Sequence, residues 1–240
     1  MIVTIDGPAG AGKSSVARKL AGALGYEFLD TGAMYRCVTL ACINQSVSLS
    51  DTERVADVAR NVSIQFSNGI VLLDGVNVTD AIREPNISQA IKEVADNLAV
   101  RECMVEAQKK WGQGKDAVTE GRDQGTVAFP DAACKIFLTA SAEERARRRV
   151  AQLQSKQIPA DFESILASQL ERDEHDRTRP VGALIAAPDS IHLDTDQLSE
   201  DQVLAELIRI VKSKKQKQKG PHFAKQQQNG EGCEVRDVAP

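Results

Sequence analysis

The sequence predicts an α/β fold built on a parallel β-sheet. Two observations lead to this prediction. Short apolar runs typical of buried strands alternate with longer segments of helical periodicity, and the first run leads through a glycine-rich loop straight into a helix. Such alternation is typical of units whose strands pair in parallel. The expected strands are Ile2–Asp6, Tyr26–Leu29, Ala117–Glu120, Lys135–Thr139 and Ser190–Asp194.

Helical segments fill the intervals between these strands. In each of them apolar residues recur at intervals of three and four, which places them on one face of a helix. The last one also has a start signal, because Ser199 can cap it and Asp201 follows in its first turn. The expected helices are Ser14–Leu24, Ala33–Asn44, Ala99–Trp111, Ala142–Gln154, Phe162–Arg177 and Glu200–Val211.

One stretch interrupts the alternation. Residues 62–66 alternate apolar and polar side chains, an Asn68-Gly69 pair follows, and residues 70–73 are again apolar. An Asn-Gly pair between two such runs is typical of a tight β-hairpin. The hairpin is either a plain extension of the fold or a small subdomain that covers a substrate.

The loop after the first strand fits the pattern G-x-x-x-x-G-K-[ST], the P-loop. Its glycines let backbone N–H groups point at phosphate oxygens, and the N-terminus of the following helix favours anions. We expect Lys13 to reach the β- and γ-phosphates and the Ser14 hydroxyl to bind Mg²⁺. A glycine-rich turn without a ligand is the alternative, but the spacing and both flanks favour a nucleoside triphosphate. The expected triphosphate contacts are Gly7, Pro8, Ala9, Gly10, Ala11, Gly12, Lys13, Ser14 and Ser15.

Composition excludes several classes of protein. The 240 residues are 42% apolar and 27% charged, as in one globular domain with small insertions. A net charge of −4 argues against a general polyanion binder. No apolar run approaches the roughly 18 residues of a membrane span, and the first strand follows Met1 at once, so we expect a cytoplasmic protein without a signal peptide. The scattered cysteines and histidines favour reduced thiols and no histidine metal site.

The C-terminal residues 212–240 differ in composition from the rest of the chain. Lys212–Lys219 is basic and polar, and a stretch rich in Gly, Gln and Asn follows without apolar periodicity. We therefore expect this tail to be disordered. It is either a solvated tail or a weak contact for nucleic acid or phosphate.

The distribution of arginine narrows the class of P-loop protein. A switch that binds GTP would carry an Asn-Lys-x-Asp segment, which is absent from the sequence, and the short strand that ends in Glu120 is a poor match to motor ATPases. Guanidinium groups bind phosphate in a bidentate manner and stabilise charge on a transferring group. Their spread over separate segments favours an enzyme that holds two phosphate-bearing molecules. These residues are Arg36, Arg122, Arg145, Arg172 and Arg179.

Three further segments carry a resemblance to a known family. Residues 30–36 read D-T-G-A-M-Y-R, residues 121–126 read G-R-D-Q-G-T, and residues 171–179 read E-R-D-E-H-D-R-T-R. In this order they resemble the D-[ST]-G-x-x-Y-R, G-R-D-x-G-T and E-R-D-x-x-D-x-x-R motifs of the bacterial cytidylate kinases. The resemblance extends from Ile2 to about Val211.

The resemblance implies a fold and a reaction. The fold is that of the P-loop kinases: a five-stranded parallel sheet wrapped by helices, a small β-containing insert that binds the nucleoside monophosphate, and a mobile helical lid. Residues 1–211 would form the kinase domain, about 61–89 the insert, and about 142–179 the lid. The reaction converts MgATP and CMP or dCMP to ADP and CDP or dCDP. We expect a monomer that binds these nucleotides and no specific nucleic acid.

The resemblance also implies roles for single residues. Arg36 and Arg122 would hold the acceptor phosphate, and Arg101 and Asp123 would read the cytosine ring. A carboxylate beside the exocyclic amine selects against uracil. Asp176 and Arg179 would contact pentose and phosphate, Thr31 and Arg172 would also bind the acceptor, and Lys13, Arg122, Arg145, Arg149 and Arg179 would act on the transferring group.

Two positions depart from the family pattern, and helical periodicity predicts which arginines of residues 145–149 face solvent. Lys92 stands where a small hydroxyl residue often contacts the base, although Ser88 lies nearby. Glu120 replaces the usual Asp before G-R-D and keeps a carboxylate for a role near Mg²⁺. Because residues i and i+4 share a helix face, Arg147 and Arg148 are expected to face solvent, opposite Arg145 and Arg149.

Two other functions stay open on the sequence. One is another P-loop kinase, which would act on shikimate, dephospho-coenzyme A or uridylate. The other is a nucleotide-binding regulatory or RNA-associated protein that uses the basic tail. The pair Arg101 and Asp123 favours cytidylate, because among the pyrimidines only cytosine offers an amine beside an unprotonated ring nitrogen.

Overall fold

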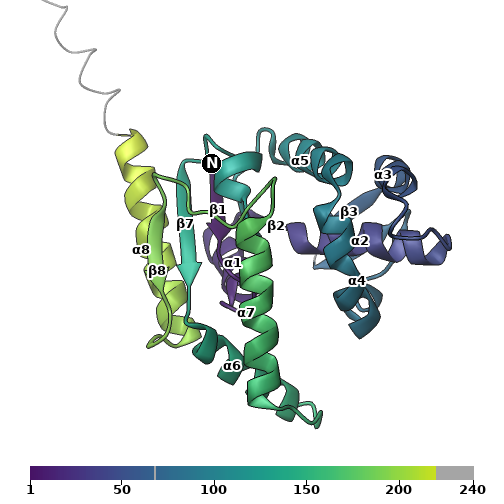
Figure 1. Ribbon diagram of the computed structural model, residues 1–240. Helices are drawn as coiled ribbons and strands as arrows, with labels where there is room; N and C mark the ends of the chain where they lie inside the picture. The colour runs from purple at the N-terminus through teal and green to yellow at the C-terminus, as the bar shows by residue number, and fades with distance from the viewer. Residues whose placement is uncertain (68, 220–240) are drawn as a thin grey trace, which may run out of the picture.

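A five-stranded parallel sheet forms the centre of the molecule (Figure 1). The computed structural model describes residues 1–67 and 69–219. Neighbouring strands pair in parallel in the order β2-β6-β1-β7-β8, which confirms the predicted fold class. The strands are β1 (Ile2–Asp6), β2 (Glu27–Asp30), β6 (Ala117–Gly121), β7 (Cys134–Thr139) and β8 (Ile191–Asp194).

The register of the strands brings several polar residues to one edge of the sheet. Asp6 pairs with Gly121, and Asp30 pairs with Glu120, at the carboxyl ends of their strands. Strands β2 and β6 lie on one side of β1, and strands β7 and β8, which come later in the chain, lie on its other side. In such sheets the crevice that binds ligands lies at this point, outside the carboxyl ends.

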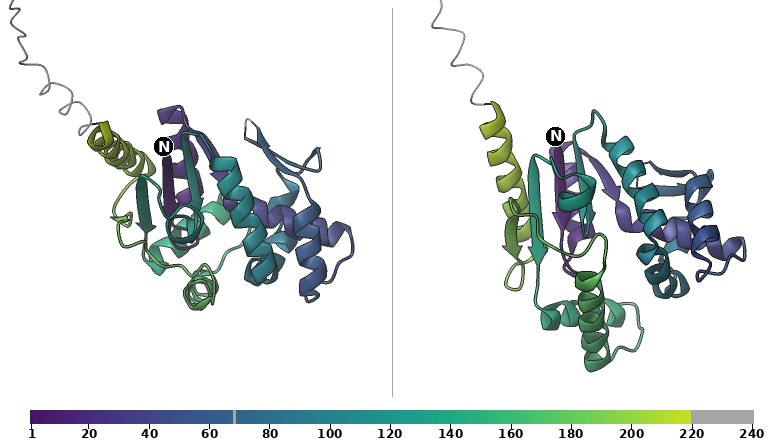
Figure 2. Two further views of the ribbon diagram at one scale, coloured as in Figure 1. Left: turned by 90° about the horizontal axis from the view of Figure 1, so that it is seen from above. Right: turned by 45° about the horizontal axis from the view of Figure 1, so that its top comes forward.

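Helices α1 (Lys13–Leu24) and α8 (Glu200–Lys219) pack against the sheet and close its hydrophobic core (Figure 1). Leu20 and Leu207 of these helices are fully buried with Ile5 and Ile136 of the strands. Helices α6 (Ala142–Gln154) and α7 (Phe162–Thr178) pack against one another, and α6 follows β7 beyond the carboxyl edge (Figure 2). They are the segment expected to form the lid.

A second hydrophobic core lies beside the sheet, on the right in Figure 1. The predicted hairpin is confirmed, since Ser67 pairs with Ile70 in an antiparallel ladder; Gly69 has φ 80°, and Asn68 lies outside the described residues. Helices α3 and α4 were not predicted, and they make this part larger than a hairpin. Its elements are α2 (Thr31–Asn44), α3 (Thr52–Asn61), β3 (Ile64–Ser67), β4 (Ile70–Leu73), β5 (Val76–Asn77), the 3-10 turn Ala81–Arg83, α4 (Pro85–Asp96) and α5 (Leu98–Gly112).

The expectation of a disordered tail is wrong for its first eight residues. Helix α8 does not end at Val211 but continues to Lys219. Lys and Gln are good helix formers, and extending an existing helix needs no new nucleation. Lys215 also donates to the Tyr26 hydroxyl at 2.8 Å, which fixes this turn against the rest of the fold. Residues 220–240 of the expected tail lie outside the described residues.

Within residues 1–67 and 69–219, no helix has the length and apolar character needed to cross a membrane.

Candidate active site

The P-loop lies at the carboxyl end of β1 and leads into α1, as predicted. Gly7 has φ 150° and passes so close to the Leu138 carbonyl of β7 that a Cβ atom there would overlap it. Only glycine allows this approach. The loop is thereby held against the sheet, with its backbone ahead of the N-terminus of α1.

Lys13, at the end of the loop and the start of α1, is buried, with 5% of the residue exposed. Its Nζ donates to the Pro8 carbonyl at 2.7 Å. Burial and the nearby charge of Arg122 lower the pKa of Lys13 to about 7, against the opposing effect of Glu120. The hydrogen-bond partner of this amine, the Pro8 carbonyl, is uncharged. A bound phosphate would place a negative charge beside the amine and so favour its protonated form.

Glu120 of β6 and Ser14 of α1 form an oxygen-rich corner beside Lys13. The Ser14 hydroxyl donates to Glu120 Oε1 at 2.9 Å. Burial and the charge of Asp30 raise the pKa of Glu120 to about 7. A hydroxyl and one carboxylate are hard oxygen donors, and Mg²⁺ commonly binds proteins through such a pair together with substrate phosphates. The donor set therefore fits Mg²⁺.

A group of arginines lies between this corner and the second core. Arg122 follows β6, Arg172 lies on α7, and Arg36 on α2 donates to Ser88 Oγ at 2.8 Å. Partial burial, followed by the charge of Arg122, lowers the pKa of Arg172, which still reaches solvent. Burial lowers the pKa of Arg36 as well. Like charges held this close together favour a polyanionic ligand.

Asp176 of α7 organises two of the guanidinium groups. Its Oδ2 accepts from Arg122 Nε at 2.8 Å, and its Oδ1 accepts from Arg179 Nη2 at 2.9 Å. Burial alone would raise the pKa of Asp176, but Arg122 and Arg179 outweigh it and the pKa is lowered. This carboxylate therefore stays ionised and holds both guanidinium groups.

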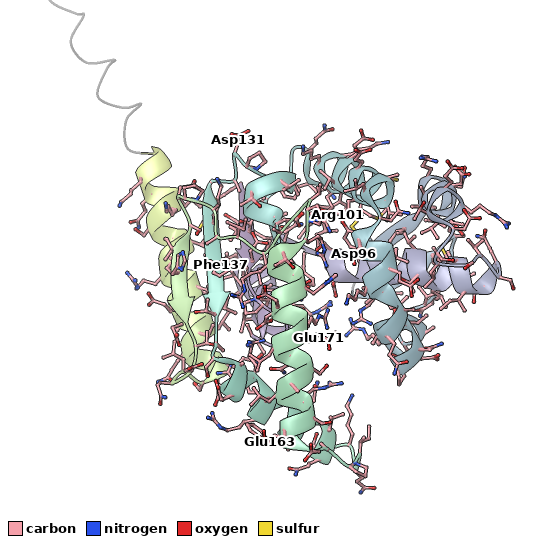
Figure 3. The ribbon with its side chains drawn as sticks, viewed as in Figure 1. Asp96, Arg101, Asp131, Phe137, Glu163 and Glu171 are labelled. Carbon is pink, nitrogen blue, oxygen red and sulfur yellow. The ribbon has the colours of Figure 1, made fainter. Side chains whose placement is uncertain are left out.

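Arg101 of α5 and Asp123, which follows β6, form a buried ion pair, and Figure 3 labels Arg101. Arg101 Nη1 also donates to the Ala95 carbonyl at 3.1 Å, while its Nε is buried without a partner among the described residues. Gly182, with φ 67°, lies directly over the pair, where a Cβ would overlap both side chains. A flat ligand with one donor and one acceptor edge would satisfy both groups.

Arg145 joins α6 to the P-loop. Its Nη1 donates to the Ala9 carbonyl at 2.9 Å and its Nε to the Ala140 carbonyl at 3.0 Å. The same guanidinium pairs with Asp173 of α7, and 3% of the Arg145 side chain is exposed. Arg145 thus reaches the loop expected to bind the donor.

Three predicted site residues have other partners. Arg149 is exposed and donates to Gln152 of its own helix, and the Ser15 hydroxyl donates to Glu200 of α8. The Thr31 hydroxyl donates to the Glu120 carbonyl at 2.6 Å. Their nucleotide contacts stay predictions.

The expectation that Arg148 faces solvent is wrong. Its guanidinium is half-buried and donates to the Thr195 carbonyl at 2.6 Å and to Glu144 Oε1 at 3.0 Å. Helix α6 lies against the segment that follows β8, so a side chain three residues after the buried Arg145 is covered on this side as well. Arg147 is exposed, as expected.

The sequence did not indicate two residues that contact this network, Asp96 and His175. Asp96 ends α4 and accepts from Arg179 Nε at 2.8 Å. His175 Nε2 lies 2.8 Å from the other oxygen of the same carboxylate. His175 occupies a free position of the E-R-D motif, and Asp96 lies in a helix that was not predicted, so neither carried a signal.

Comparison with known proteins finds similarity over most of the chain. The cytidylate kinase family profile matches residues 3–213. A cytidylate kinase of Rhodopirellula baltica is 49% identical over 212 residues, which cover 88% of this chain and 93% of that protein. The cytidylate kinase of Caldanaerobacter subterraneus subsp. tengcongensis is 44% identical over 210 residues, covering 88% and 94%. That of Actinobacillus succinogenes is 44% identical over 225 residues, covering 89% and 99%.

Proposed function

This chain belongs to the cytidylate kinase family, and from that premise we propose that it transfers the γ-phosphoryl group of ATP to CMP and to dCMP. As a member of the family it is a nucleoside monophosphate kinase, a transferase that phosphorylates CMP. ATP as donor, dCMP as a second acceptor, and the residue roles below are proposed.

One observation supports the base specificity above all others. In the buried pair Arg101 and Asp123, the Arg101 Nε has no hydrogen-bond partner among residues 1–67 and 69–219, and it lies beside a carboxylate. Cytosine offers an amine to a carboxylate and a ring nitrogen and a carbonyl to a guanidinium. Burying a charged donor without a partner is costly, so a ligand that supplies the missing acceptor binds better than one that does not.

The acceptor phosphate would lie among Arg36, Arg122, Arg172 and Arg179. An oxygen of this phosphate attacks the γ-phosphorus of ATP, and the bond from that phosphorus to the β-phosphate oxygen breaks. Because the attacking oxygen is already anionic near neutral pH, no general base is needed. Catalysis then consists of positioning and of neutralising charge.

Donor phosphates would lie on the loop at residues 7–14, with Lys13 between them and Arg145 approaching from α6. Ser14 and Glu120 would hold Mg²⁺ together with the phosphates. When bound, Mg²⁺ supplies further neutralisation of phosphate charge. Asp123 takes no proton in this scheme, because its place beside Arg101 suits recognition of the base.

A coupled assay of ADP release tests the proposal with CMP, dCMP, UMP, AMP and GMP in parallel. We expect turnover with CMP and dCMP to exceed that with the other three. Asp123→Asn should lower kcat/KM for CMP by about 100-fold, because a bidentate contact that reads a base contributes about 1–3 kcal/mol. The KM for ATP should stay within about twofold.

Asp57→Asn is the matched control, since Asp57 is exposed on α3. Unchanged CMP kinetics in Asp123→Asn would reject the assignment of the base site. Fast turnover of UMP alone would favour uridylate, and slow turnover of every monophosphate would favour a regulatory protein.

A further inference from the structure

Asp96 is the last residue of α4. Its carboxylate contacts His175 of α7 and Arg179, the residue that follows α7. Oδ1 accepts from Arg179 Nε at 2.8 Å, and Oδ2 lies 2.8 Å from His175 Nε2. Residues 175 and 179 are four positions apart, so both side chains reach the same carboxylate. Figure 3 shows Asp96 between α4 and α7, near Arg101.

Asp96 is one of two carboxylates that orient Arg179. The other is Asp176, which binds Nη2 at 2.9 Å and also binds Arg122. With Nε and Nη2 occupied, the plane of the Arg179 guanidinium is fixed, and its remaining N–H groups, which make no hydrogen bond within the described part of the chain, can donate to a ligand. The Arg179 side chain is only 8% exposed, which restricts it further.

This arrangement counters electrostatic repulsion. Arg179 lies within the field of the other arginines, since its charge contributes to the lowered pKa of Arg172. Without a nearby anion, like charges would drive Arg179 away from the acceptor site. Asp96 supplies negative charge from the second core, on the side opposite α7.

Polar contacts are important here because the two hydrophobic cores are separate. The core around β1 and α1 and the core around α2–α5 contain different residues. Among the described residues of α4, Asp96 is the one that forms ion pairs with α7 and Arg179. The preceding residue, Ala95, accepts from Arg101, so the end of α4 also contacts the base site.

We propose that Asp96, supported by His175, is a positioning residue for the acceptor nucleotide: it fixes Arg179 in the binding orientation when α7 lies against α4. This inference rests on the proposed function, because it assigns Arg179 to the acceptor side. Asp96 touches no reacting atom and acts only through Arg179.

Steady-state kinetics of Asp96→Asn test the inference, with whichever monophosphate the unaltered enzyme phosphorylates fastest. The KM for that acceptor should rise about tenfold, as expected when a charged hydrogen bond is weakened. The KM for ATP should stay within about twofold, because the donor side does not depend on Arg179 orientation. Glu93→Gln, an exposed change one turn earlier on α4, is the matched control.

His175 variants show whether the effect passes through Asp96. His175→Ala should raise the acceptor KM about threefold, whereas His175→Gln keeps a donor for Asp96 and should restore it. Asp96→Asn combined with His175→Ala should be no worse than Asp96→Asn alone, because both act on one carboxylate.

Two results would overturn the inference. One is an acceptor KM that is unchanged in both Asp96→Asn and His175→Ala. The other is a parallel change of both KM values with a lowered Tm, which indicates a structural role. If Asp96→Asn does not fold, the two His175 variants decide alone. An unaltered enzyme that ignores CMP would instead contradict the proposed function, and the Asp96 test would proceed with its true acceptor.

Discussion

Lys13 shows how the P-loop is prepared for an anion. A buried amine whose pKa is lowered to about 7 is largely neutral at pH 8. A triphosphate beside it would favour the charged form and raise the pKa again. Binding and protonation are therefore coupled at this residue, with Lys13 charged in the complex.

The coupling predicts that MgATP binding takes up protons at pH 8, because a group whose pKa is lowered to about 7 is largely neutral there. ATP affinity should fall as pH rises from 7 to 9. Titration calorimetry in two buffers of different ionisation enthalpy measures the uptake. Lys13→Met should abolish it, whereas Lys19→Met, an exposed change on the same helix, should keep it. Zero uptake by the unaltered protein would contradict the lowered pKa.

At the scale of elements, α6 is fixed by a buried ion pair. Arg145 pairs with Asp173 of α7, and their side chains are 3% and 10% exposed. The same arginine donates to a P-loop carbonyl. One side chain therefore links α6, α7 and the loop, so its structural and functional effects must be separated.

Arg145→Met should lower the free energy of unfolding by about 3–5 kcal/mol, because it leaves Asp173 buried without a partner. Arg145→Met with Asp173→Leu should recover most of that loss. Activity should fall about 100-fold in both, since Arg145 is proposed to stabilise the transferring group. Urea denaturation and the coupled assay measure the two effects, with exposed Arg147→Met as control. Recovery of activity in the double variant would exclude a role in transfer.

Elements with a strong local pattern were predictable from the sequence, and those fixed by tertiary contact were not. The β-branched run of β1 and the loop after it define strand, turn and helix within the first 24 residues. Helix α4 is an exception, because Ile87, Ile91 and Val94 recur at intervals of four and three, and this periodicity was present in the sequence but was missed. The last turns of α8 are polar, and the contact of Lys215 with Tyr26 is visible only in the fold.

The residues of the candidate site also divide into those that the sequence could predict and those that it could not. Residues with fixed spacing from a motif, such as Lys13, Arg101 and Asp123, could be named in advance. Asp96 could not, because its function depends on where α4 ends relative to α7. The exposure of Arg148 was predicted wrongly, because helical periodicity indicates which residues share a face of α6 but not how many of its faces are covered by other segments.

On the scale of the whole molecule, two hydrophobic cores meet across a polar site. The core around β1 and α1 and the core around α2–α5 are separate clusters, and Leu29 of β2 belongs to the second. The contacts described between α7 and α4 are ion pairs of Asp96 with Arg179 and His175. A nucleotide bound as proposed, between the two cores, would add contacts to both.

Each ligand should therefore slow hydrogen exchange in a different part of the molecule. CMP at 100 times its Kd should slow exchange by up to about 100-fold around residues 96–104 and 176–184. A non-hydrolysable ATP analogue should protect residues 7–20 instead. Residues 203–215 of α8, which lie on the other side of the sheet from the second core, are the internal control for CMP and should change little. Equal slowing of this control helix by CMP would mean that the nucleotide binds elsewhere.

Gly182 limits how the surroundings of the Arg101–Asp123 pair can evolve. A Cβ atom there would overlap the ends of both side chains, and its φ of 67° is a backbone conformation that favours glycine. Every substitution at this position therefore adds atoms where the ion pair lies and strains the backbone. If the pair reads the base as proposed, a new base preference is reached more readily through Arg101 or Asp123 than through the glycine above them.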